Sequence, residues 1–133
     1  EEKGEIIDFK DKGIKFWGKA MYEHSPLFHP LSPTPERIKD TWFIGMAHGH
    51  FEESDTSSGR SSLIFPKEIA DSHFDYIALG HWDLYTDVSQ GNTSAVYSGC
   101  PMVVGNRNEP GSVSLVDLDT NKGALHKQWY LKP

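Results

Sequence analysis

The sequence predicts an α/β domain weighted towards β-strands, with a mixed sheet and few short helices. Short apolar runs recur along the chain, and Gly, Pro, Asn, Asp and Ser clusters separate them, which is typical of strands joined by tight turns. Signals for helix starts are few. A length of 133 residues fits one domain, so we expect residues 1–133 to form a single folded unit.

Composition narrows the class of protein. Hydrophobic residues make up 37% of the chain and charged residues 24%, which fits an ordinary soluble globular domain. The net charge of -6 argues against a surface that binds nucleic acid by electrostatics alone. Cys100 is the single cysteine, so an intrachain disulfide is excluded and a cytoplasmic location is expected. No apolar run approaches the length of a membrane span, and we expect no membrane partner.

The first half of the chain reads as a hairpin, a loop and a buried strand. Residues 5–9 and 14–21 are predicted to form two strands of a hairpin, joined by a short turn over 10–13 that contains Gly13. Four prolines make residues 22–35 a loop. Thr34 followed by Pro35 predicts a turn of helix to about residue 39.

The second half adds strands around one short helix. Residues 51–62 are acidic and then Ser- and Gly-rich, which predicts a mobile loop in which the carboxylates are solvated. The remaining expected elements are a helix over 62–72, strands over 94–97, 112–117 and 124–131, turns over 87–92 and 119–123, and a loop over 104–111.

The most informative stretch is an apolar strand that ends in potential metal ligands. Residues 77–79 (IAL) suit a strand covered on both faces, and Gly80 then allows a sharp turn and a close approach of another group. His81 and Asp83 point to one side if the chain stays extended, and imidazole with carboxylate suits manganese, iron or zinc. The alternative is a plain turn in which His81 makes one hydrogen bond and Asp83 caps a loop.

A second strand leads to the same edge. Residues 42–47 form an apolar run followed by His48, Gly49 and His50, so two strands of one sheet are expected to present histidine together.

These stretches resemble a known family. Residues 75–81 (DYIALGH), 96–101 (VYSGCP) and 43–48 (FIGMAH) are similar to the carboxyl-terminal motifs of calcineurin-like metallophosphoesterases, in the branch close to DNA-repair exonucleases. The resemblance implies a phosphoester substrate, with a nucleic acid or a nucleotide as candidates. It also implies two divalent metal ions, with Mn expected first and Fe or Zn as alternatives. It places His48 and His81 on the second metal. Asp83 stands where the family has a histidine on the first metal.

The family's amino-terminal metal motifs do not occur in this sequence. The resemblance therefore implies the β-rich, carboxyl-terminal half of a metallophosphoesterase α/β sandwich, with the other half on the same or another chain. This chain alone is then expected to be inactive. An exposed former interface would also favour a homodimer.

Other residues are weaker candidates. His50 is a possible metal ligand without a counterpart in the family, and Asn106 and Arg107 are candidates for contact with substrate phosphate, with a solvated loop as the alternative. Gly99 and Cys100 are expected beside the site, where Cys100 replaces a family serine and packing is its simpler role.

Two other functions stay open. The fold could serve as a non-catalytic scaffold. Alternatively, the four residues of the strand ends could form a self-contained mononuclear metal site: His48, His50, His81 and Asp83.

Overall fold

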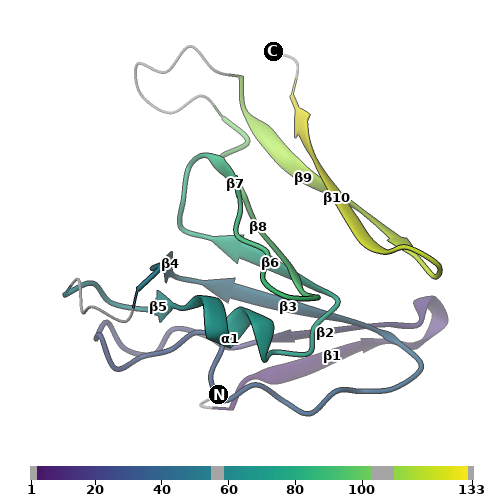
Figure 1. The fold of residues 1–133 in the computed structure, drawn as a ribbon, viewed down its shortest axis with the longest axis horizontal. Coiled ribbons are helices and arrows are strands. Elements are labelled where there is room, and N and C mark those ends of the chain that lie inside the picture. Colours follow the sequence, from purple (N-terminus) through teal and green to yellow (C-terminus); the bar gives the residue numbers. More distant parts are fainter. Residues whose placement is uncertain (1–2, 55–58, 103–109, 132–133) are drawn as a thin grey trace.

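A computed structural model describes residues 3–54, 59–102 and 110–131. Its centre is a six-stranded mixed sheet with the order β1-β2-β3-β6-β8-β7, and two two-stranded sheets, β4-β5 and β9-β10, accompany it (Figure 1). The elements are β1 (Glu5–Phe9), the 3₁₀ turn η1 (Lys10–Lys12), β2 (Ile14–Gly18), β3 (Trp42–His48), β4 (His50–Phe51), β5 (Leu63–Ile64), α1 (Pro66–Ala70), β6 (Tyr76–Gly80), β7 (Tyr85–Asp87), β8 (Ser94–Ser98), β9 (Ser112–Asp119) and β10 (Gly123–Tyr130). This confirms the prediction of a β-rich domain with a mixed sheet and few helices.

The middle of the sheet is parallel. β2, β3, β6 and β8 run in the same direction, whereas β1 and β7 pair antiparallel at the two edges. In the register of β3 and β6, His48 lies opposite Gly80. The carboxyl ends of these two strands therefore meet at one edge of the sheet, as the sequence predicted.

The two faces of the sheet are covered differently. Because side chains alternate along a strand, Phe43 and Ala47 of β3 point to the face that α1 covers, while Ile44 points to the face of the β9–β10 hairpin. The first face carries the larger buried cluster, which includes Ile69 of α1. On the hairpin side the cover is partial, and Met46 is 51% exposed there.

The expected helix after Thr34 is absent, and that prediction was wrong. The Thr34 hydroxyl donates back to the carbonyl oxygen of Leu31 and so does not cap a helix. Arg37 reaches forward to the carboxylate of Asp75 at 2.7 Å and to the carbonyl oxygen of Thr41 at 3.2 Å. The bond to Asp75 is a tertiary contact, and residues 34–38 form no helix, so tertiary structure overrides the local start signal.

The region before β6 also differs in detail. Leu63 and Ile64 form β5 rather than the start of a helix, because β5 pairs parallel with β4. The helix is confined to Pro66–Ala70. Within the described residues, no helix is long and apolar enough to cross a membrane.

Candidate functional site

Gly80 brings β6 against the imidazole of His48. A Cβ at position 80 would lie 3.0 Å from Nδ1 of His48, which is tighter than nine in ten real Cβ contacts. The backbone N–H of Gly49 donates to the carbonyl oxygen of Gly80 at 3.2 Å, which ties the two strand ends together. The glycine expected to allow a close approach thus does so, and the approaching group is His48.

His81 follows at a strained backbone position. Its φ is 123°, a region that residues with a side chain rarely occupy. Its ring lies 5.4 Å from that of His48, centroid to centroid, at an interplanar angle of 80°. Backbone strain of this kind costs about 1–3 kcal/mol and clusters at functional sites. His48 and His81 are both exposed to solvent, so the pair is accessible.

Asp83 comes after a bend in the chain and does not lie on an extended strand. The chain bends at His81, so the argument that placed Asp83 on the same side by alternation does not hold. Asp83 is exposed, and its backbone carbonyl oxygen accepts a 2.9 Å hydrogen bond from the N–H of Cys100. Its carboxylate still acts electrostatically on His81, because it opposes the lowering of that residue's pKa.

A groove opens beside His48 on the hairpin side of the sheet. It has a volume of about 530 Å³, and its lining comes from the ends of β2, β3 and β6 and from the residues after β2. Met46, His48, Ala78 and Gly80 line it, because alternate residues of β3 and β6 share that face. His48, one member of the exposed histidine pair, therefore borders an open and largely apolar space.

His50 lies on the other side of His81. Their ring centroids are 5.7 Å apart, and the indole Nε1–H of Trp82 donates to Nδ1 of His50 at 3.1 Å. Trp82 stacks on the buried ring of Tyr97 at 4.5 Å. Sequence reasoning missed the roles of Trp82 and Tyr97, although the position of Trp82 directly after His81 was a usable signal.

Electrostatics favour neutral imidazoles at this edge. Partial burial lowers the pKa of His50, and the positive charges of Arg60 and His81 lower it further, against a smaller opposing effect of Glu52. Partial burial, His48 and Arg60 lower the pKa of His81 in the same way. A neutral imidazole offers a lone pair, which is the form that binds metal ions. Arg60 is a third residue that sequence reasoning missed, and its Ser- and Gly-rich surroundings carried no signal.

The loop after β8 returns to the same region. Gly99 has a φ of +77°, and a Cβ there would lie 3.2 Å from the carbonyl oxygen of Asp83. Cys100 pairs through its backbone with Asp83 and with the N–H of Ser112. Both residues thus lie beside Asp83, in the turn that follows His81. Asn106 and Arg107 lie outside the described residues.

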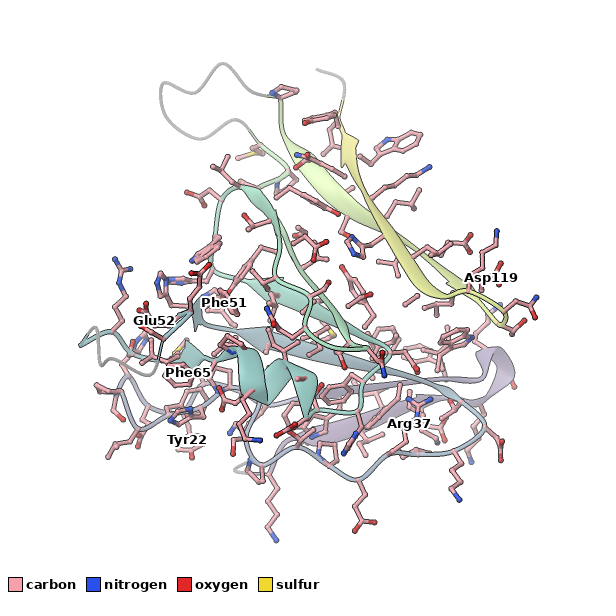
Figure 2. All side chains as sticks on the ribbon, in the orientation of Figure 1. Tyr22, Arg37, Phe51, Glu52, Phe65 and Asp119 are labelled. Atoms are coloured by element: carbon pink, nitrogen blue, oxygen red, sulfur yellow. The ribbon has the colours of Figure 1, made fainter. Side chains whose placement is uncertain are left out.

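The acidic loop is anchored at both ends. His50 N–H donates to the carbonyl oxygen of Ser62 at 2.9 Å, and Glu52 N–H donates to that of Ile64 at 3.0 Å. Figure 2 shows Phe51 and Glu52 at this edge of the molecule, with Asp119 and Arg37 towards the opposite end. Of the carboxylates in this loop, Asp55 is outside the described residues.

The described residues contain no cluster of three or more His, Cys, Asp or Glu side chains placed to hold a metal ion. What the structure brings together is the pair His48 and His81, with His50 beyond it. Models of known protein families give no match to the chain, and a search of curated proteins finds no relative.

Proposed function

We propose that this chain is the carboxyl-terminal part of a metal-dependent phosphoester hydrolase, with phosphodiesterase or nuclease-like activity when complete. The observation that carries the proposal is the meeting of His48 and His81 at one strand edge, with Gly80 packed against His48. Short parallel strands that end in a glycine and a histidine are what the calcineurin-like resemblance implies for this half of the fold. The finer architecture, one β-rich half of an α/β sandwich, belongs to the same proposal.

The residues present suit part of a metal site. Two accessible imidazoles, with the pKa of His81 lowered, match the nitrogen ligands that Mn, Fe and Zn accept. Two such ions would polarise the phosphoryl group and lower the pKa of water. Their remaining ligands would come from the amino-terminal half, so we expect this chain alone to bind metal weakly and to be inactive.

Under this proposal, the groove beside His48 is this chain's part of the substrate site. Met46, Ala78 and Gly80 are among its lining residues, and most of the lining is apolar. Under this proposal the amino-terminal half covers the groove and excludes water from the site, and a phosphoester enters beside His81. In a homodimer, a second copy of this chain would cover the groove instead.

Metal titration tests the proposal directly. We would titrate Mn²⁺ and Zn²⁺ into the chain joined to its amino-terminal half, and compare His48→Ala and His81→Ala with His24→Ala, an exposed loop histidine. Loss of binding in the first two variants alone, together with hydrolysis of bis(p-nitrophenyl) phosphate by the unmodified protein, would support it. Metal binding that is weakened by neither His48→Ala nor His81→Ala would contradict the proposal.

A non-catalytic scaffold is the second candidate. The exposure of Asp83 and the bend before it favour this reading, because they loosen the position that the family fills with a histidine. A complete protein that binds metal but does not hydrolyse the phosphodiester would favour the scaffold over the hydrolase.

A further inference from the structure

One ring nitrogen of His50 accepts a hydrogen bond from an indole. Trp82 Nε1–H donates to Nδ1 of His50 at 3.1 Å. An indole N–H is a donor only, so Nδ1 of His50 must be the acceptor. A neutral imidazole has one proton, and in this arrangement the proton sits on Nε2.

The indole is itself held in place. Trp82 stacks on Tyr97 with a centroid distance of 4.5 Å and an interplanar angle of 16°. Tyr97 is fully buried, and its hydroxyl donates to the carbonyl oxygen of Gly49 at 2.7 Å. Burial raises the pKa of Tyr97, so the hydroxyl keeps its proton and stays a donor. The partner of His50 is therefore anchored in the core.

The tautomer decides what His50 can bind. A metal ion needs a nitrogen lone pair, but the lone pair of Nδ1 already accepts from Trp82 and Nε2 carries the proton. Among the described residues, no protein acceptor pairs with this Nε2–H. An N–H donor at the edge of a site suits an anion better than a cation.

The neighbours of His50 also favour an anion. The positive charge of Arg60 acts on His50 more strongly than the negative charge of Glu52 does. The charge of Arg60 acts on His81 in the same sense. The His81 ring stands perpendicular to that of His50 at 5.7 Å, which places the donor beside the proposed metal ligands.

We infer that His50 is a phosphate-binding residue, which donates its Nε2–H to a non-bridging oxygen of a phosphoryl group, and that Trp82 is the positioning residue that fixes this donor tautomer. The inference rests on the proposed function and names a substrate contact within it. It also gives His50 a role other than the metal ligand that the sequence suggested.

The tautomer is tested by long-range ¹H–¹⁵N spectra of the histidine rings. Unmodified protein should show the Nε2–H form of His50 at neutral pH. Trp82→Phe keeps the aromatic stack on Tyr97 but removes the donor, and should shift His50 towards a mixture of tautomers. An Nδ1–H form in the unmodified protein would overturn the inference.

The contact is tested by titration with inorganic phosphate, followed by the same ring signals and by calorimetry. We expect His50→Leu to weaken phosphate binding about tenfold, the effect of one hydrogen bond to a charged group. Trp82→Phe should weaken it about twofold, because part of the protein keeps the Nε2–H form. His50→Gln, which retains an N–H donor, should recover most of the affinity. Equal affinity in unmodified protein and His50→Leu would overturn the inference.

A zinc titration separates this inference from the proposed function. His50→Leu should leave the zinc affinity within about twofold of the unmodified value, whereas His81→Ala should lower it about tenfold or more. An equal loss in both variants would make His50 a ligand and overturn the inference, with the hydrolase proposal intact. Zinc binding that ignores His81, with phosphate binding that still needs His50, would count against the hydrolase and leave the anion contact standing.

Discussion

A Cβ at Gly80 would lie 3.0 Å from Nδ1 of His48, so the position of this histidine depends on the missing side chain of its neighbour. The two residues lie opposite each other in the parallel register of β3 and β6. Replacing Gly80 therefore acts on the proposed metal site without removing a ligand.

Gly80→Ala should lower zinc affinity about tenfold, because the added methyl group displaces the His48 ring. Gly18→Ala is the matched control, since its Cβ would meet the carbonyl oxygen of Met46 at 3.4 Å, an ordinary contact near the same groove. Calorimetric titration of both variants measures the effect. Equal zinc affinity in the two would show that Gly80 does not set the position of His48.

The backbone strain at His81 can be tested by substitution. With a φ of 123°, His81→Gly should be more stable than His81→Ala by about 1 kcal/mol, because only glycine relaxes at that position. Both variants should lose zinc binding. Urea unfolding measures the difference, and an alanine variant as stable as the glycine variant would remove the argument for strain.

Gly99 separates steric crowding from backbone conformation. Gly99 and Gly123 have φ values of +77° and +84°, but only at Gly99 would a Cβ meet other atoms, the nearest being the Tyr85 nitrogen at 2.9 Å. Gly99→Ala should cost about 3 kcal/mol and Gly123→Ala about 1 kcal/mol. Chemical unfolding of the two variants measures their stability. Similar losses of stability would mean that the loop beside Asp83 shifts at little cost to accept the added methyl group.

Asp87 should make stability depend on acid pH. Its partial burial raises the pKa, but hydrogen bonds from the Ser89 hydroxyl and N–H and the charge of His126 outweigh this and hold the pKa below its ordinary value of 3.8. A carboxyl with a lowered folded-state pKa stabilises the protein above its ordinary pKa, and that contribution is lost as the pH falls through the folded-state value.

Unfolding in urea at pH 5 and at pH 3 measures this contribution. Unmodified protein should lose more stability between the two values than Asp87→Asn does. The surface variant Asp11→Asn should behave like the unmodified protein. The same pH dependence in Asp87→Asn would assign the effect to other carboxyls.

The local pattern of residues was enough to predict most strands. Apolar runs bounded by glycine located β3, β6 and β8, and the turn after residue 119 located the β9–β10 hairpin. Histidines at the ends of β3 and β6 were expected at one edge, because parallel strands end on the same side. These features follow from short-range alternation and turn chemistry, which a single sequence carries.

Contacts between distant residues were decided by the tertiary structure alone. Arg37 bonds to Asp75 in a segment without helix, where Thr34 and Pro35 signalled one. The chain bends at His81, so Asp83 is not placed on the same side as His81 by an extended strand. The tautomer of His50 follows from Trp82, 32 residues away in sequence. The sequence by itself determined which side chains reach the edge of the sheet; packing between segments decided which way they face and which of their atoms remain free to bind.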